Sequence, residues 1–397
     1  MVEDSPLDGV GARVRAMRKL QPNLTQQQLA DKAHVSLSLV KAVEQGRAPA
    51  TAAFVAAVAP ALGVTVYDLY NQPSPRYGAE RAGIAELETA VMAGPALADD
   101  GPPAALAELG QRESQVFELV RRCRYDASSR QLPVLLADLH TAAAAAPPGA
   151  ALERAHWLLA EAYNNAMFCL YRLGSTLAGQ AAERSAAAAR QGGDPLLAAR
   201  SDGLVWLPLM HRGAYPEATR VVARAQDSIA DQPAGPETFT IRGILHLNSA
   251  IVAARQGSAG NADAHLTEAA DLASHLPPVS DLYGTAFCAA NVHIHSVAAA
   301  VEMADGTTAV GRDAATTLPP DTPRRRLGHH HVDLARAWLL HGDRDRALAE
   351  LYRARELTPQ LVRYHPQVHE TLATLAETDR RRSDSLAGFA RWAGVRY

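Results

Sequence analysis

The residues whose types and spacing point to a specific chemistry lie near the start of this 397-residue chain. Ser36, Leu37, Ser38 and Lys41 fall close together and offer hydroxyl groups, an apolar contact and a cation. These groups suit contacts with base edges in a nucleic-acid groove. Serine and leucine discriminate between bases less sharply than arginine or asparagine do, so we expect modest direct readout of a base sequence.

The charge of this region supports a polyanionic partner. Between Gly9 and Tyr67 there are seven Lys and Arg residues against Asp31 and Glu44, a balance of +5, whereas the whole chain has a formal charge of −3. A compact basic block ahead of a mildly acidic remainder is typical of a chain that meets nucleic acid with one end. The alternative is that these basic residues only solvate the surface of a helical module.

Short helices are expected to position these residues. Apolar residues recur at helical spacing from Leu7 to Met17, and Pro22-Asn23 should stop that helix. Thr25 and Gln28 have the spacing of a capping box, and Ser36 is placed to cap a third helix that Gly46 closes. Two further helices are predicted over residues 51–62 and 65–70.

The second and third predicted helices, joined by a turn of three to four residues, form a helix-turn-helix. The string TQQQLADKAHVSLSLVKAVEQGRAPA…ALGVTVYDLY resembles the phage-repressor-like (XRE/Cro) family along its whole length. This resemblance implies that the third helix enters the major groove of operator DNA, with Gln26 on a phosphate and Arg47 on the backbone. His34 departs from the family, which has glycine in this turn. The predicted DNA-binding residues are Thr25, Gln26, Ser36, Leu37, Ser38, Lys41 and Arg47.

A recurring pattern of small residues marks the rest of the chain. Alanine, an apolar residue and alanine follow a glycine at offsets of 5, 9 and 12 in copies starting at Gly213, Gly257 and Gly342, and a looser copy starts at Gly174. The pattern resembles the second helix of the tetratricopeptide repeat, most clearly in HGDRDRALAELYRARELTP. Spacings of 39 and 44 between the first glycines exceed the usual repeat of about 34, so we expect longer helices.

The expected fold is therefore all-α, with an N-terminal five-helix helix-turn-helix domain followed by a right-handed, tetratricopeptide-like (TPR-like) α-solenoid with a concave face. The expected divisions are a DNA-binding domain over 1–72, a linker (PSPR) and first helix over 73–102, and a sensor and dimerisation domain over 103–397. About six helix pairs are predicted, including a first pair in 103–146, a degenerate one in 281–317 and a capping pair in 366–395.

Polar residues are expected along the concave face of this solenoid. The resemblance to tetratricopeptide repeats implies that residues nine before each repeat glycine, and their neighbours one turn away, line the groove. Asparagine there can donate to and accept from a peptide backbone. Alternatively, these asparagines satisfy neighbouring helix ends and bind nothing. The predicted ligand-binding residues are Glu161, Asn165, Arg200, Asn248, Asn291, His295, His329, Asp333 and Arg336.

Two further patterns lie near the fourth repeat. His329-His330-His331 are consecutive, and side chains about 100° apart on a helix cannot chelate one ion together, so we predict no metal site. The basic run Arg324 to Arg326 is either a solvated helix start or a contact for a ligand carboxylate or phosphate. No cofactor is expected.

Composition and motifs argue against other classes of protein. The sequence has no GxSxG, no phosphate-binding glycine loop, no HExxH and no cysteine with a partnering base, which argues against an enzyme. Its three separated cysteines exclude a disulfide framework. The acidic, polar first residues predict no signal peptide, and no apolar stretch is long enough for a membrane span, so a cytoplasmic protein is expected.

Together these patterns predict a transcriptional regulator whose head binds an operator as a homodimer while the solenoid senses a peptide or small-molecule effector. The architecture resembles that of RRNPP peptide-pheromone receptors and, more closely, of actinobacterial XRE–tetratricopeptide regulators. Effector binding is expected to alter solenoid curvature and so the separation of the two heads. The alternative is an interaction scaffold that binds a protein such as a sigma factor, with DNA binding secondary.

Overall fold

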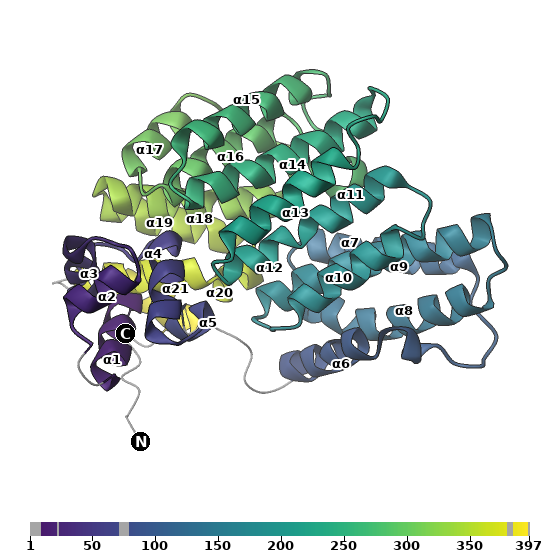
Figure 1. Cartoon of the computed structure of the whole chain (residues 1–397), viewed down its shortest axis with the longest axis horizontal. Coiled ribbons are helices and arrows are strands. Elements are labelled where there is room, and N and C mark those ends of the chain that lie inside the picture. Colours follow the sequence, from purple (N-terminus) through teal and green to yellow (C-terminus); the bar gives the residue numbers. More distant parts are fainter. Residues whose placement is uncertain (1–8, 22–23, 71–78, 379–383, 396–397) are drawn as a thin grey trace.

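The structure is a computed structural model that describes the chain apart from residues 1–8, 22–23, 71–78, 379–383 and 396–397. Every element in the described part is helical, which confirms the all-α prediction (Figure 1). We call α1–α5 the head and α6–α22, a solenoid-like array, the body. The predicted contribution of Leu7 to the first helix, the stop at Pro22-Asn23 and the PSPR linker lie outside the described residues.

The head contains the five predicted helices, and the caps predicted at Thr25 and Ser36 are present. Thr25 and Gln28 form a complete capping box, and the hydroxyl groups of Ser36 and Thr51 accept the backbone N–H groups of Leu39 and Phe54. These caps fix where each helix begins and so orient the helix-turn-helix. The helices are α1 (Val10–Leu20), α2 (Gln26–Lys32), α3 (Leu37–Glu44), α4 (Ala52–Leu62) and α5 (Val66–Tyr70).

The body is a succession of antiparallel helix pairs. The pairs are α7 with α8, α9 with α10, the broken helix α11–α12 with α13, α14 with α15, α16 with α17, and α18 with α19. The helices are α6 (Ala79–Ala93), α7 (Leu106–Arg121), α8 (Tyr125–Ala145), α9 (Ala150–Arg172), α10 (Ala178–Ala189), α11 (Pro195–Leu204), α12 (Trp206–His211), α13 (Tyr215–Asp227), α14 (Pro236–Arg255), α15 (Ala259–Ser274), α16 (Ala289–Glu302), α17 (Gly306–Ala314), α18 (Arg324–His341), α19 (Arg344–Leu357), α20 (Pro359–Arg363), α21 (Pro366–Thr378) and α22 (Asp384–Ala393), with short 3₁₀ turns η1 (Gly94–Leu97) and η2 (Leu282–Gly284).

The repeat glycines occupy the turns between paired helices. Gly174, Gly213, Gly257 and Gly342 all have positive φ, from 73° to 100°, which glycine adopts without steric cost. The alanines five residues after the last three glycines are fully buried. The irregular α16–α17 unit makes the same turn with Ala304 at φ 61°. An alanine in place of the glycine explains why its sequence looks degenerate.

These turns predict opposite effects from two reciprocal substitutions. Gly257→Ala should lower the free energy of unfolding by about 1–2 kcal/mol, because alanine is disfavoured at φ 73° although nothing lies within 4 Å of its Cβ. Ala304→Gly should raise that free energy by a few tenths to about 1 kcal/mol, since relief of strain exceeds the added entropy of the unfolded chain. Urea unfolding measures both; a destabilising Ala304→Gly would contradict the argument.

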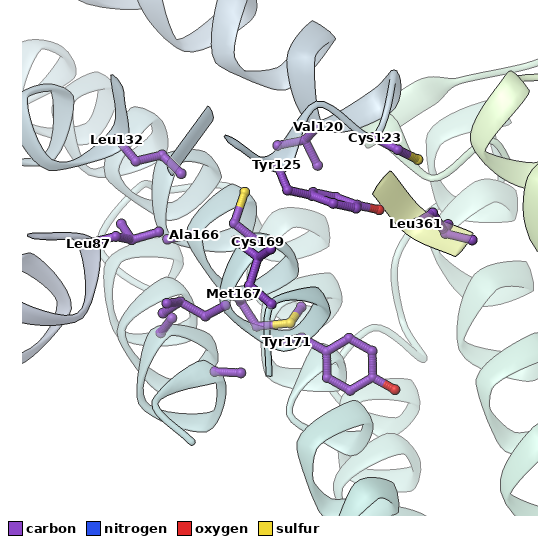
Figure 2. Close-up of a cluster of buried hydrophobic side chains, with 14 of the residues drawn as sticks. Leu87, Val120, Cys123, Tyr125, Leu132, Ala166, Met167, Cys169, Tyr171 and Leu361 are labelled. Carbon is purple, nitrogen blue, oxygen red and sulfur yellow. The ribbon is translucent and has the colours of Figure 1, made fainter. Parts of the chain in front are cut away.

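The body packs its last helices against its first. Asp126 on α8 and Gln360 on α20 exchange two hydrogen bonds, of 3.1 and 2.6 Å, across 234 residues of sequence. Figure 2 shows Leu361 of α20 beside the ring of Tyr125, and both belong to one buried apolar cluster. The η2 segment also reaches inward, where Asp281 pairs with Arg121 of α7 at 3.1 Å. The concave face therefore surrounds a cavity, which differs from the open groove predicted from the repeats.

The head is docked on the body through α1, α4 and α5, next to α21 (Figure 1). A Cβ placed on Gly213 would lie 2.7 Å from Ala56 Cβ, so the turn before α13 approaches α4 very closely. Hydrogen bonds cross between the two parts: Val10 N–H to Glu370 Oε2 (3.0 Å), Gln367 Nε2 to Tyr70 Oη (2.9 Å), and the Tyr215 hydroxyl to the Ala52 carbonyl (3.2 Å).

Candidate functional site

The outer face of α3 carries the predicted recognition residues. Ser36, Ser38 and Lys41 are exposed and Leu37 is partly exposed, whereas Val40 on the opposite face is fully buried in the head. The hydroxyl groups of Ser36 and Ser38 lie 3.0 Å apart. Because the head docks through α1, α4 and α5, these side chains lie on the exposed surface of the described head.

Gln26 is held in position by a buried carboxylate. Gln26 Nε2 donates to Glu44 Oε2, and Arg18 Nε donates to Glu44 Oε1, both at 2.7 Å. Burial alone would raise the pKa of Glu44, but the hydrogen bonds from Arg18 and Gln26 outweigh it and lower that pKa. In the described chain the Gln26 amide donates one hydrogen bond, to Glu44, so its second N–H is placed to donate elsewhere. The exposed cations Arg15 and Lys19 share a surface hollow with Gln26, and the sequence patterns had not singled them out.

The turns around α3 place the remaining predicted contacts. Thr25 is exposed at the start of α2, and Arg47 is exposed beyond α3, where Gln45 Oε1 accepts from Arg47 Nε at 2.8 Å. His34 has φ 52°. A positive φ is what we expected here, because the XRE/Cro family usually has glycine at this position. The geometry is thus a capped recognition helix with cations and an amide on either side.

Residues 10–69 match the family model of the helix-turn-helix domain. The match spans all five helices of the head but for the last residue of α5, and it supports a DNA-binding regulator rather than an enzyme. No curated protein matches the chain. Among the described helices, none is long and apolar enough to cross a membrane.

The helix-turn-helix domain also borders a cavity of the body. This cavity has a volume of about 260 Å³, and four residues of α4 and α5 form part of its wall: Ala52, Ala56, Val66 and Tyr70. Burial raises the pKa of the Tyr70 hydroxyl, which accepts from Gln367. The helix-turn-helix domain and the body therefore share the wall of one cavity.

Six of the nine predicted ligand-binding residues line this cavity: Arg200, Asn248, His295, His329, Asp333 and Arg336. The other three do not. Glu161 pairs with Arg200 at 2.8 Å, and Asn165 donates to Glu113 at 3.0 Å, so both satisfy buried neighbours. Asn291 is buried in α16 outside the lining, and its side-chain amide has no hydrogen-bond partner within the described chain.

A buried ion network forms one part of the lining. Glu302 accepts from Arg255 Nε and from Arg336 Nη1, each at 2.9 Å, and Arg336 Nη1 also lies 3.1 Å from Asp333. Burial alone would raise the pKa of Glu302, but Arg255 and Arg336 lower it to about 2. Burial, aided by nearby Glu302, raises the pKa of Asp333. The positive charges of two arginines thus lie beside two carboxyl groups that can neutralise them.

The three consecutive histidines have separate environments. His329 lines the cavity, His330 is buried with its Nε2 2.8 Å from Asp313 Oδ1, and His331 Nδ1 lies 2.6 Å from Glu350 Oε2. Within the described chain no group of three His, Cys, Asp or Glu residues is arranged to hold a metal ion. Their divergence matches the 100° rotation between helical neighbours.

Proposed function

We propose that the chain is a sequence-specific transcriptional regulator in which a small-molecule or short peptide effector, bound in the TPR-like body, modulates operator binding by the helix-turn-helix domain. The carrying observation is that α4 and α5 form part of the cavity wall. The volume of about 260 Å³ lies just below the usual 300–1,000 Å³ of small-molecule pockets, so it favours a compact ligand over a long extended peptide.

Docking of the head offers the route by which effector binding reaches DNA. A body whose first and last helices contact each other resists the change of curvature expected from the sequence. An occupant that touches Tyr70 or Ala56 instead changes the stability of the docked head. In the proposed homodimer, docked heads hold two recognition helices at a fixed separation, which matters because half-sites lie about 34–36 Å, or a multiple of that distance, apart. By linkage, DNA must alter effector affinity by the same factor.

Weakening the docked head tests this proposal. Glu370→Ala removes the acceptor of the Val10 N–H and the carboxylate 3.8 Å from Arg13, so it should increase the radius of gyration in small-angle X-ray scattering. With a duplex selected from genomic fragments, fluorescence anisotropy should show changed affinity for two half-sites and unchanged affinity for one. Glu217→Ala is the matched control, because Glu217 forms an exposed ion pair with Arg220 on the same helix.

Three results would count against it. Equal affinity changes for one and two half-sites would mean that Glu370→Ala damages the head itself. A variant that leaves both the scattering and the two-site affinity unchanged would remove docking from the mechanism. The third result is that the wild type binds the selected duplex with no higher affinity than bulk DNA at two salt concentrations. This result would favour the scaffold function, because a specific binder keeps a higher affinity for its site than for bulk DNA.

A further inference from the structure

Three arginines in the cavity wall have no acidic partner. Arg172, Arg325 and Arg326 all line the cavity, and within the described chain no carboxylate lies within 4.0 Å of their guanidinium groups. Their contacts are to neutral groups. Arg172 Nη2 lies 3.0 Å from His329 Nε2, Arg325 lies 5.1 Å from the ring centre of Phe168, and Arg326 Nη2 donates to the Thr285 carbonyl at 2.9 Å.

This arrangement of like charges is electrostatically unfavourable by itself. Burial and the neighbouring charge of Arg325 lower the pKa of Arg326 to about 9, and burial with Arg172 lowers the pKa of His329. Arg325 and Arg326 also lie in the first turn of α18, where the helix dipole favours acidic residues. The balanced network around Glu302 shows that this body pairs partly buried arginines elsewhere. Among the described residues Arg172, Arg325 and Arg326 have no such close partner, and the carboxylate of Asp281, which pairs with Arg121, attracts Arg326 only from beyond ion-pair distance.

We propose that Arg172, Arg325 and Arg326 bind the anionic group, a carboxylate or a phosphate, of a small amphipathic effector. Guanidinium groups bind both anions through paired N–H donors. The Arg326 Nε–H has no hydrogen-bond partner in the described chain and is available to such an oxygen. Apolar and aromatic residues elsewhere in the lining suit the uncharged part of the ligand: Trp206, Leu207, Ile244 and Ile251. This inference rests on the proposed effector function and specifies its ligand.

The test compares three probes that share one apolar chain: octanoate, octyl phosphate and octanol. Calorimetry on the full chain should show binding of one or both anions and at least about tenfold weaker binding of octanol, since a charged hydrogen bond is lost. Arg325→Gln and Arg172→Gln should each weaken binding of the anions by about tenfold or more. Arg220→Gln on the exposed face of α13 is the control and should bind normally.

A second readout separates a binding role from a structural one. Without ligand, Arg325→Gln should melt at the same temperature as the wild type or higher, because it relieves repulsion among cations. With an anion it should gain less stability than the wild type. A large loss of stability without ligand would show that Arg325 is structural and would overturn its assignment. Equal binding of octanol and the anions, no binding of either anion, or normal anion binding by both variants would overturn the whole inference.

The outcomes also distinguish this inference from the proposed function. If the anions bind but leave DNA affinity unchanged, the anion site stands and the sensing function fails. If Glu370→Ala alters two-site DNA binding but neither anion binds, the docking mechanism stands and the ligand class is wrong.

Discussion

Glu302→Gln is expected to lower the free energy of unfolding by about 3–5 kcal/mol at neutral pH. Glu302 is buried and accepts hydrogen bonds from Arg255 and Arg336, so its neutral replacement leaves two largely buried cations with Asp333 as the remaining carboxyl group of this network. Glutamine keeps the size of the side chain, so cavity formation does not contribute. Urea denaturation monitored by circular dichroism measures the loss.

The difference between wild type and Glu302→Gln should depend on pH. The pKa of Glu302 is lowered to about 2 in the folded protein from an ordinary value of 4.5. A lowered pKa contributes stability that is fully present above pH 4.5 and is lost as the pH falls through 2. The stability gap should therefore narrow as the pH falls below 4.5. Glu217→Gln, in an exposed pair with Arg220, should change stability by less than about 1 kcal/mol. If Glu302→Gln also lowers the free energy of unfolding by less than about 1 kcal/mol at neutral pH, the ion network does not stabilise the fold as predicted.

Lys41→Ala is expected to weaken specific DNA binding by about 1–3 kcal/mol, roughly 5- to 150-fold, and to change sequence preference. Lys41 is exposed on the face of α3 that is free in the docked head, where its ammonium group can reach base edges. Gln26→Ala should weaken binding to all sequences alike, because its amide is placed for a phosphate. Selection of bound duplexes from a random pool, followed by anisotropy, measures both effects.

Arg220→Ala on α13 is the control for the removal of a surface cation, and it should bind DNA as the wild type does. If Lys41→Ala and Gln26→Ala both bind the selected duplex like the wild type, α3 is not the recognition helix. If Gln26→Ala changes sequence preference, its assignment to a phosphate is wrong, because backbone contacts carry no direct base information.

Features that depend on a few neighbouring residues were predictable from the sequence. The capping box at Thr25, the cap at Ser36 and the positive φ of His34 and of the repeat glycines follow from short-range backbone chemistry. The fixed offsets after each glycine likewise indicate which alanines are buried, because residues at these spacings lie on the same face of a helix. Local rules of this kind located the helix-turn-helix domain.

Features that depend on distant segments were not predictable. Gln360 lies in a five-residue helix with no periodic pattern, yet it joins α20 to α8 and closes the body. The groove offset missed Arg172, Arg255, Glu302 and His365, because that offset describes an open array and these residues converge through closure and docking. Arg324 to Arg326 stood out as a basic run, but a composition signal could not show that Arg325 and Arg326 face a cavity and lack acidic partners.

The wall that α4 and α5 contribute to the cavity has a kinetic consequence. If a ligand leaves the cavity through this wall, its dissociation rate cannot exceed the rate at which the head separates from α21. This limit holds whatever the intrinsic affinity of the ligand. Its residence time is then set by the strength of contacts such as Glu370 with Val10, which are not part of the cavity lining. In the proposed regulator, mutations at these contacts would change how long the response lasts after the effector is removed, independently of the effector concentration that triggers it.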